Sequence, residues 1–396
     1  MLYRGSLAAG ALAALALPSA SSATLLYVTS YAGTVTTLNL TVTSPSAASL
    51  QSIATSTECG AQPSWLTLVG PNLYCLDESW GQLNGSLISF TTSPTTGKLT
   101  LLDKATTIGG PVSAVVYGQG GAGLAIADYA EAGINTFNIA NPADLQPVQA
   151  NAWVLPQKGP NPDRQEKPHP HQAILDPTGK FLLVPDLGFD RVHVFSLDQV
   201  TLKQTELAPL LSPPGSGPRH GVFVKAGEKT LFYVITELSN QIIGYSVTYK
   251  ADNTLGFTQV YISGTHGPEP VPAGAAGGEI ALSPDSKFIT VSSRNEASLK
   301  IPNFDKTNST QLASDPLITF SINYDTGALT LVQKFPAGGL VPRHFSFNKA
   351  GTLVASAAQK DGRLAIISRD VSTGVLKEYV ANIAIVGEVN CAIFAE

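Results

Sequence analysis

Hydrophobic and polar positions repeat along most of this 396-residue chain. A typical unit starts at a proline or glycine, continues into a short apolar run and reaches a tight turn such as DPTGK, SPDSK or NKAGT. A second apolar run follows, then a segment in which apolar and polar residues alternate, then a more polar segment. Alternation with a period of two, bounded by turn residues, indicates β-strands joined by hairpins. Each unit is therefore predicted to contain four short strands.

The unit restarts roughly every 50 to 60 residues, a period typical of repeat architectures. Two copies even share the letters Pro-Arg-His, in GPRHGVFVKAGEK and VPRHFSFNKAGT. The six complete copies start at Pro63, Pro111, Pro170, Pro218, Gly278 and Pro342. Four-stranded units at this spacing, with no convincing amphipathic helix between them, predict a β-propeller.

A seventh unit is divided between the two ends of the chain. TLLYVTSYAGTVTTLNLTV, near the N-terminus, supplies strands of the second and third kind, and GEVNCAIFAE at the C-terminus supplies a first strand. Pairing them in one blade would close the ring and remove both open sheet edges. We predict an all-β, seven-bladed β-propeller with four-stranded blades, formed as one domain by residues 24–396. The alternative, two stacked β-sandwiches, leaves the regular restarts unexplained.

The first 23 residues have a different pattern. Arg4 precedes an apolar run from Leu7 to Leu17 and a stretch of small residues, which is typical of a secretory signal peptide cleaved after Ala23. The run is too short to span a bilayer core of about 30 Å, and no later segment is apolar enough to span one. We therefore expect a secreted or cell-wall-associated protein.

The glycosylation motifs and the cysteines become informative in a secreted chain. In a secreted chain the acceptor motif Asn-X-Ser/Thr predicts glycosylation. The motif starts at Asn39, Asn84 and Asn308. An oxidising route also permits one disulfide among three cysteines, and pairing Cys59 with Cys75 closes the shorter loop, leaving Cys391. The alternative is three buried, unpaired cysteines.

Composition excludes several functions. Only 13% of residues are charged, against about 25% in an average domain. The net charge of −5 offers no basic surface for nucleic acid. GxSxG, GxxxxGK and GxGxxG motifs in a suitable context are absent from the sequence, so a serine hydrolase or a nucleotide-binding fold has no support.

Polar residues fall at two recurring positions of the repeat. The first and second strands of a blade are antiparallel, so the start of one and the end of the next lie at the same rim. Because first strands line the channel of a propeller, these positions should converge on one mouth. They hold His171, Asp186, Arg219, Glu237, Glu279, Arg294, Arg343 and Gln359. Removing charges from water at such a place destabilises the folded protein unless the charges are paired or bind a ligand.

Part of this set is expected to form ion pairs between blades, with Glu279 and Asp186 the best candidates. The three arginines exceed that need, and arginine suits the recognition of carboxylate or phosphate. We predict packing roles for His220 and His344.

A metal site is the less favoured alternative. His169 and His171 form an HxH pair, but no further His or Cys at useful spacing completes a zinc site. A calcium site built from channel carboxylates is a second alternative. The sequence thus predicts no metal.

Four segments carry a resemblance to a known family: HPHQAILDPTGKFLLVPDLGFDRVHVF, GPRHGVFVKAGEKTLFYVITELSNQI, GEIALSPDSKFITVSSRN and PRHFSFNKAGTLVASAAQKDG. They resemble the seven-bladed propeller lactonases, which include propeller-type 6-phosphogluconolactonase and the fungal 3-carboxy-cis,cis-muconate lactonizing enzyme. The resemblance implies an enzyme that acts on a small lactone or unsaturated carboxylic acid without metal or organic cofactor. The proposed active-site residues of the family, a His, two Arg and a Glu, correspond to His171, Arg219, Arg294 and Glu237.

The resulting hypothesis is lactone formation or lactone opening in the channel. Arg219 and Arg294 hold a carboxylate and stabilise developing negative charge, while His171 and Glu237 are the acid/base candidates. The predicted substrate-binding residues are Arg343, Gln359, Glu279, Asp186 and His220. The alternative is a secreted, glycosylated propeller that acts as a non-catalytic surface antigen or adhesin in contact with cell-wall or surface glycans.

Overall fold

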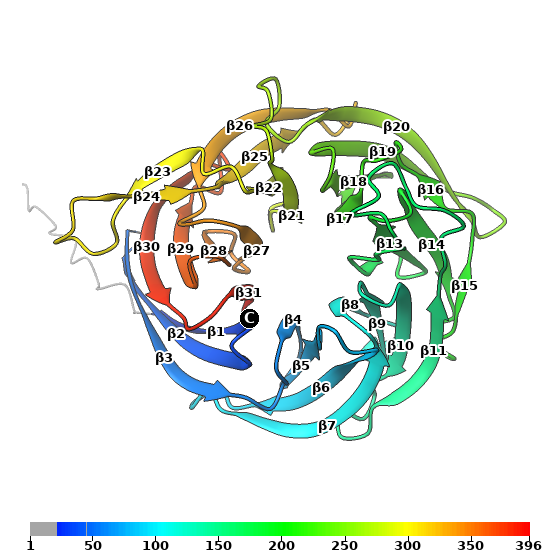
Figure 1. Cartoon of the computed structure of the whole chain (residues 1–396), viewed down its shortest axis with the longest axis horizontal. Helices are drawn as coiled ribbons and strands as arrows, with labels where there is room; N and C mark the ends of the chain where they lie inside the picture. The colour runs from blue at the N-terminus through cyan, green and yellow to red at the C-terminus, as the bar shows by residue number, and fades with distance from the viewer. Residues whose placement is uncertain (1–21, 45) are drawn as a thin grey trace, which may run out of the picture.

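The computed structural model describes residues 22–44 and 46–396, in which seven blade sheets are arranged around a central axis and a small two-stranded sheet lies apart from them (Figure 1). The predicted seven-bladed propeller is therefore confirmed. Residues 1–21 of the predicted signal peptide lie outside the described residues, and Ser22 and Ala23 begin the first strand. Secretion thus stays a prediction. Within the described part of the chain, no helix is long and apolar enough to cross a membrane.

Each blade runs outward from the channel in chain order, except that blade 1 takes its innermost strand from the C-terminus. Blade 1 contains β31 (Val389–Phe394), β1 (Ser22–Ser30), β2 (Thr34–Ser44) and β3 (Ala47–Ser56). Blade 2 contains β4 (Pro63–Val69), β5 (Asn72–Asp77), β6 (Asn84–Thr92) and β7 (Leu99–Ile108). Blade 3 contains β8 (Pro111–Tyr117), the short 3₁₀ turn η1 (Gln119–Gly121), β9 (Gly123–Asp128), β10 (Gly133–Asn138) and β11 (Gln146–Ala152).

Blades 4 to 7 follow the same plan. Blade 4 contains β12 (Ile174–Leu175), β13 (Phe181–Asp186), β14 (Arg191–Leu197), β15 (Gln204–Glu206) and β16 (Leu210–Leu211). Blade 5 contains β17 (Pro218–Ala226), β18 (Lys229–Thr236), β19 (Gln241–Tyr249) and β20 (Leu255–Gly264). Blade 6 contains β21 (Ala276–Leu282), β22 (Phe288–Arg294), β25 (Pro316–Ile322) and β26 (Leu329–Pro336). Blade 7 contains β27 (Pro342–Phe347), β28 (Leu353–Ala358), β29 (Arg363–Arg369) and β30 (Leu376–Ala384).

The ring closes as the divided seventh unit predicted. Strand β31 pairs antiparallel with β1, with Leu26 opposite Phe394 and Val28 opposite Ala392. In Figure 1 the C-terminal strand β31 accordingly lies beside the N-terminal strand β1. Closure removes both free sheet edges, which would otherwise be open to pairing with another chain.

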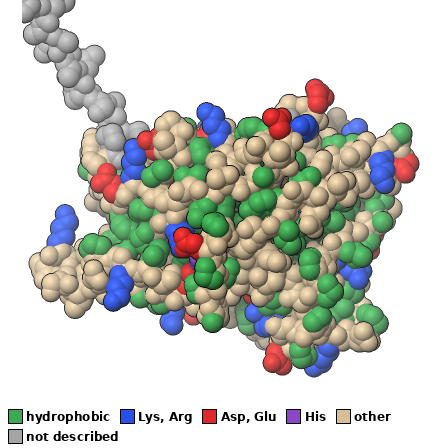
Figure 2. Space-filling view, turned by 90° about the horizontal axis from the view of Figure 1, so that it is seen from above, with side chains coloured by type: hydrophobic (Ala, Val, Ile, Leu, Met, Phe, Trp, Pro, Cys, Tyr) green, Lys and Arg blue, Asp and Glu red, His purple; other side chains and the backbone are tan. Residues whose placement is uncertain are grey.

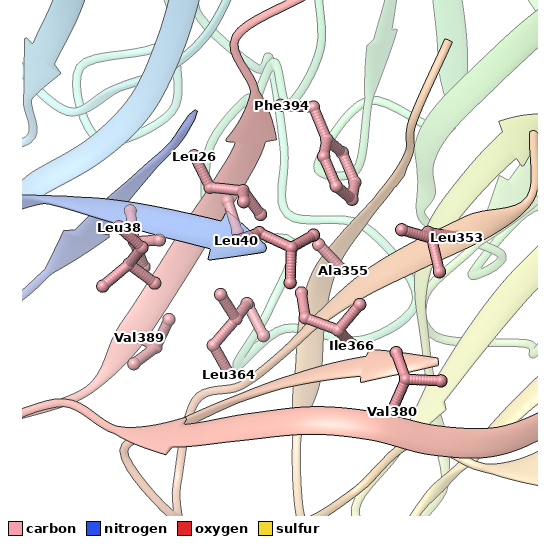
Figure 3. Close-up of a cluster of buried hydrophobic side chains, with 13 residues drawn as sticks. Leu26, Leu38, Leu40, Leu353, Ala355, Leu364, Ile366, Val380, Val389 and Phe394 are labelled. Atoms are coloured by element: carbon pink, nitrogen blue, oxygen red, sulfur yellow. The ribbon is translucent and has the colours of Figure 1, made fainter. Parts of the chain in front are cut away.

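Apolar side chains between neighbouring blades form the core. The cluster between blades 7 and 1 joins residues from both ends of the chain (Figure 3). Leu26, Leu38 and Phe394 of blade 1 lie there with Leu364 and Ile366 of blade 7, all buried. Burying apolar surface contributes about 25 cal/mol per Å² of area removed from water. Inter-blade packing therefore stabilises the closed ring as well as each sheet.

A β-bulge recurs at the mouth end of the inner strands. Pro218 pairs with Thr236, but His220 pairs with Ile235, so Arg219 is an extra residue in its strand. The pairings of β4, β8, β21 and β27 shift register at the corresponding place. A bulge releases a residue from the ladder and changes the direction of its side chain. The repeated letters Pro-Arg-His thus mark two bulges that present Arg219 and Arg343 at the mouth.

The sequence prediction missed two features. Blade 6 contains an inserted hairpin of β23 (Leu299–Pro302) and β24 (Gln311–Ser314), which projects from the rim in Figure 1. The unit that starts at Pro170 predicts a full first strand, but only Ile174 and Leu175 form a ladder in β12, with Pro170 in an isolated bridge to Asp186.

The predicted covalent sites lie in different settings. Cys59 and Cys75 form a disulfide, as predicted, and Cys391 is a buried free thiol. Asn84 and Asn308 are exposed, whereas Asn39 lies in β2 between two other strands. Glycosylation acceptors normally occupy surface loops. The exposed pair therefore suits glycosylation better than Asn39, and modification stays a prediction.

Charged side chains on the outer wall are sparse, and several form opposite-charge pairs, such as Lys334 with Glu269 and Lys377 with Asp370. Figure 2 shows one side of the molecule, where Lys, Arg, Asp and Glu side chains are scattered among uncharged ones. This distribution contrasts with the concentration of charge at the channel mouth described below.

We expect Leu38→Ala to lower the free energy of unfolding by about 2–5 kcal/mol, because it opens a cavity in the cluster of Figure 3. Chemical denaturation measures the effect. Leu83→Ala is the matched control, since Leu83 is 77% exposed, and its effect should be within about 0.5 kcal/mol. Equal losses from the two variants would contradict the importance of inter-blade packing.

Candidate active site

Three guanidinium groups converge on the carboxylate of Glu237, just after β18. Nε of Arg219 donates to Oε2 at 3.0 Å, and Nη2 of Arg294 lies 2.7 Å from the same oxygen. Nη2 of Arg164 donates to Oε1 at 2.5 Å. Burial disfavours the charged carboxylate, but the charges of Arg294, Arg219 and Arg164 outweigh it and hold the pKa of Glu237 well below its usual value. Glu237 is therefore a permanent anion in this cluster.

The two buried arginines of this cluster are also tied to backbone carbonyls. Nη1 of Arg219 donates to the carbonyl of Gly278, and Nη2 of Arg294 donates to that of Gly277, each at 2.7 Å. Burial and the charge of Arg294 lower the pKa of Arg219 to about 9, so the group still carries its proton at neutral pH. Both side chains are thus fixed in place by Glu237 and by the start of β21.

A second set of buried groups forms a relay beside this cluster. Nδ1 of His171 lies 3.1 Å from Nε2 of His220, and Nδ1 of His220 lies 2.7 Å from Oε1 of Glu279. Nε2 of His344 lies 4.0 Å from the other Glu279 oxygen. Burial opposes ionisation of Glu279, but His220 and His344 hold its pKa at about 2. Burial lowers the pKa of His220 to about 4, although Glu279 opposes the shift.

These partners fix the protons of the relay. An ionised Glu279 only accepts hydrogen bonds, so Nδ1 of neutral His220 carries the hydrogen and its Nε2 has a lone pair. That lone pair accepts from Nδ1–H of His171, which leaves Nε2 of His171 basic. Nε2 of His171 has no hydrogen-bond partner among the described residues. Burial and the charges of Arg219 and Arg343 lower the pKa of His171 well below its usual value, so the ring is neutral at neutral pH.

Blades 7, 1, 2 and 3 complete the mouth. Nη2 of Arg343 lies 3.6 Å from a Glu78 oxygen, and the hydroxyl of Tyr31 donates to the other oxygen of Glu78. The Tyr129 ring packs edge-on against His171, with centroids 5.3 Å apart. The charge of Arg343 acts on both His171 and Tyr129, so Arg343 belongs to the same electrostatic cluster.

Asp315 holds the turn that follows Arg294. Its buried carboxylate accepts N–H bonds from Asn295, Glu296 and Ala297 at 2.7–3.0 Å, and from Val341 at 2.7 Å. Asn295, Ala297 and Val341 all have positive φ, which is unfavourable without such support. One side chain therefore fixes both the end of β22 and the residue before Pro342, which opens the strand of Arg343.

Trp65 separates the charged mouth from the other half of the channel. Its ring packs edge-on against His344 at 5.2 Å and against His220 at 6.1 Å between centroids. Beyond it is a cavity of about 390 Å³. Its lining includes Trp65, Ala114, Val115, Ile174, Val222 and Phe223. The relay is therefore shielded on this side by an apolar environment.

Some predicted site residues have other partners. Oδ1 of Asp186 accepts the backbone N–H groups of His169 and Phe189, and its Oδ2 faces His193 at 3.3 Å. This differs from the substrate-binding role predicted for Asp186, because its carboxylate is engaged by protein groups of blade 4. The ion pair also differs from the inter-blade pair expected of Asp186, because His193 belongs to the same blade.

Gln359 and the HxH pair are also engaged elsewhere. Nε2 of Gln359 donates to Glu388 at 2.7 Å. His169 bonds to Glu166 and to the Tyr129 carbonyl, whereas His171 bonds to His220, so the two rings do not share a ligand. The described residues contain no group of three or more His, Cys, Asp or Glu side chains that could hold a metal ion.

The structure brings His171, Arg219, Glu237 and Arg294 together at the mouth, with Arg343 nearby. Glu279 and His220 lie behind His171 rather than at the opening. Arg164, Tyr129, Trp65 and Asp315 also belong to this region, and the repeat pattern does not point to them. Asp315 could have been suspected from the Asp-Pro pair at the start of β25, but Arg164 lies in a long loop outside the repeat, where periodicity gives no signal.

A family model described as "Lactonase, 7-bladed beta-propeller" matches residues 25–394. A probable 6-phosphogluconolactonase of Arthroderma benhamiae is 31% identical over 317 residues, which cover 79% of this chain and 75% of that protein. The 6-phosphogluconolactonase of Bacillus subtilis is 27% identical over 305 residues, covering 77% and 78%.

Solved structures share the fold. A putative 6-phosphogluconolactonase from Bacteroides fragilis superimposes with a TM-score of 0.77 and 24% identity, covering 95% of this chain and 98% of that one. The periplasmic gluconolactonase of Pseudomonas aeruginosa has a TM-score of 0.77 and 22% identity, covering 94% and 99%.

We expect Glu237→Gln to lower the free energy of unfolding by about 3–5 kcal/mol, because three guanidinium groups lose their shared counter-ion. Chemical denaturation at neutral pH measures the loss. The control is Glu378→Gln at an exposed position of β30, which should change stability by less than about 0.5 kcal/mol. A Glu237→Gln protein as stable as the wild type would show that the cluster does not need this charge.

Proposed function

Because this chain belongs to the family of seven-bladed β-propeller lactonases, we propose that it hydrolyses a small lactone that carries an anionic group. One observation above all supports the proposal. The Glu279–His220–His171 relay leaves a basic nitrogen beside a group of guanidinium cations. Hydrolysis of an ester needs a base to activate water and cations to stabilise the oxyanion that forms.

His171 rather than Glu237 is assigned as the base. Both oxygens of Glu237 are occupied by guanidinium groups, Oε1 by Arg164 and Oε2 by Arg219 and Arg294, so the carboxylate is not free to accept a proton from water. His171 has its Nδ1 hydrogen held by His220, and its Nε2 is neutral and without a partner among the described residues. Glu279 and His220 act through His171, in the way that a carboxylate fixes the tautomer of a catalytic histidine.

The proposed reaction proceeds in two steps. Nε2 of His171 takes a proton from water as the oxygen attacks the lactone carbonyl carbon, and the carbonyl π electrons move to its oxygen. The oxyanion then collapses, the bond from the carbonyl carbon to the ring oxygen breaks, and the His171 imidazolium returns the proton to that oxygen. The product is a hydroxy acid, and no other reactant is consumed.

Arg294 and Arg343 are the proposed partners of the oxyanion. Arg219 is only 1% exposed, and its Nε and Nη1 donate to Glu237 and Gly278, so it contributes mainly charge and position. The Arg343 side chain is more open, with a long contact to Glu78 at 3.6 Å and the Tyr31 ring centroid at 6.0 Å. Preorganised cations in a site shielded from water stabilise such charge strongly.

The names of the relatives favour lactone opening. The proteins reported above are named as 6-phosphogluconolactonases or as a gluconolactonase, and none of these four is named for carboxymuconate cyclisation or for adhesion. A mouth rich in arginine suits a substrate with a negative charge. The proposed substrate class is therefore a sugar-acid lactone bearing an anionic group.

We expect Arg294→Ala to lower kcat for lactone hydrolysis by about 10²–10³-fold, the loss typical of a removed oxyanion donor. Glu237 keeps Arg219 and Arg164 as partners, so the variant should remain folded. Stopped-flow kinetics on 6-phosphogluconolactone measures the effect. Arg363→Ala, at a residue that packs on Phe304 away from the mouth, is the control. Unchanged turnover in Arg294→Ala would refute the assigned role.

The pH dependence should follow His171. Its pKa is lowered by burial and by Arg219, His220 and Arg343, so the neutral base persists to lower pH. The acidic limb of kcat/KM should therefore lie below pH 6.5. Glu279→Gln should move this limb still lower and reduce kcat by about 10²-fold or more, because the relay loses its fixed tautomer.

Glu206→Gln serves as the control for the pH experiment, because Glu206 also bonds to a buried histidine, His193, but in the outer part of blade 4. Its profile should match that of the wild type. A Glu279→Gln enzyme with wild-type kcat and an unshifted acidic limb would exclude the relay.

A further inference from the structure

A long loop covers the mouth between blades 3 and 4. We call residues 153–168, which follow β11 and precede the inner strand of blade 4, the mouth loop. Nη2 of Arg164 in this loop reaches Glu237 in blade 5. The Arg164 side chain is 42% exposed, whereas that of Arg219 in the same cluster is 1% exposed. Arg164 is thus the member of the cluster that solvent and ligands reach most easily.

Most hydrogen-bond donors of Arg164 are uncommitted. A guanidinium group has five N–H donors, and among the described residues Glu237 accepts from one of them and the Tyr129 hydroxyl engages a second. The charge of Arg164 is also incompletely balanced, because Glu237 is shared with Arg219 and Arg294. An exposed cation with free donors and a shared counter-ion is suited to bind an anion from solution.

The mouth loop holds Arg164 in a preformed position. Gln165 is fully buried, where its Oε1 accepts from the Asn161 N–H at 3.0 Å and its Nε2 donates to the Leu187 carbonyl at 2.9 Å. The loop backbone packs directly on Gly188, where an added Cβ would lie 1.8 Å from the Lys167 carbonyl oxygen. Little ordering of the loop is therefore needed when a ligand binds.

The side chain of Tyr129 lies between Arg164 and His171, the proposed base. Tyr129 packs edge-on against His171 and also lies beside the Arg164 guanidinium. The carboxylate of Glu166, an acid of the same loop, is engaged by His169. A lactone carbonyl placed at His171 would thus direct the far end of a sugar-sized molecule toward Arg164.

We propose that Arg164 forms a second anion subsite, which binds the phosphate of a sugar-phosphate lactone and makes this chain prefer a phosphorylated lactone over its neutral counterpart. The subsite rests on the proposed lactonase function, which it refines. Arginine recognises phosphate through paired N–H donors, and an exposed Arg164 can keep its bond to Glu237 through Nη2 while its other nitrogens bind the ligand.

The test compares kcat/KM for 6-phosphoglucono-δ-lactone and for glucono-δ-lactone. The wild type should favour the phosphorylated lactone by about tenfold or more, and Arg164→Gln should lower that ratio about 10–100-fold, mainly through KM, as expected for loss of a charge-assisted hydrogen bond. Arg164→Lys should recover part of the ratio, since lysine keeps the charge but not the paired donors.

The matched control is Lys167→Gln. Lys167 belongs to the same loop and its side chain is 41% exposed, but it faces Glu131 rather than Glu237. This variant removes the same charge and should leave the ratio unchanged. A ratio near one in the wild type, or an Arg164→Gln variant that loses both activities equally, would overturn the subsite.

A binding measurement separates the subsite from the catalytic proposal. Titration calorimetry with 6-phosphogluconate and gluconate needs no turnover. Tighter binding of 6-phosphogluconate to the wild type, lost in Arg164→Gln and kept in Lys167→Gln, supports the subsite even if neither lactone is hydrolysed, a result that would refute only the proposed function. Equal affinities for the two acids in the wild type would overturn the subsite whatever the activity.

Discussion

The ionised carboxylate of Glu237 is the interaction on which the mouth depends. Guanidinium groups from the mouth loop, β17 and β22 repel one another, and they share this one buried anion. Without it, the desolvation of Arg219 and Arg294 would be uncompensated. The same pairing makes Glu237 a poor base, so proton transfer is left to His171. A single carboxylate therefore sets both the positive charge of the site and the division of roles within it.

Backbone geometry supplies the convergence that Glu237 then stabilises. A bulge at the start of β17 and another at the start of β27 turn Arg219 and Arg343 out of their ladders. Pairing of β31 with β1 fixes the ring that makes these positions face one another. Function thus depends on closure by a strand that comes last in the chain and carries none of the proposed catalytic residues.

The repeat was enough to predict the blades, the shared seventh blade, the inner-strand positions of Arg219 and Arg343 and the place of His171 just before an inner strand, because strand periodicity and turn residues are local signals. It could not predict Arg164, which reaches Glu237 from a loop without periodicity, or the direction of Asp186, whose position fits the pattern although its side chain turns to His193. The hydrogen bonds of the relay could not be predicted either. The repeat places His220 and Glu279 near the rim, but it does not show which of their atoms are in contact.

A crystal structure with bound 6-phosphogluconate, the hydrolysis product of the proposed substrate, would be the most direct measurement. We predict its carboxylate within hydrogen-bond distance of Nε2 of His171 and of an Arg294 or Arg343 nitrogen, with its phosphate at Arg164. Binding at another surface, or a His171 ring whose Nε2 points away from the ligand carboxylate, would contradict a hydrolytic site at this mouth.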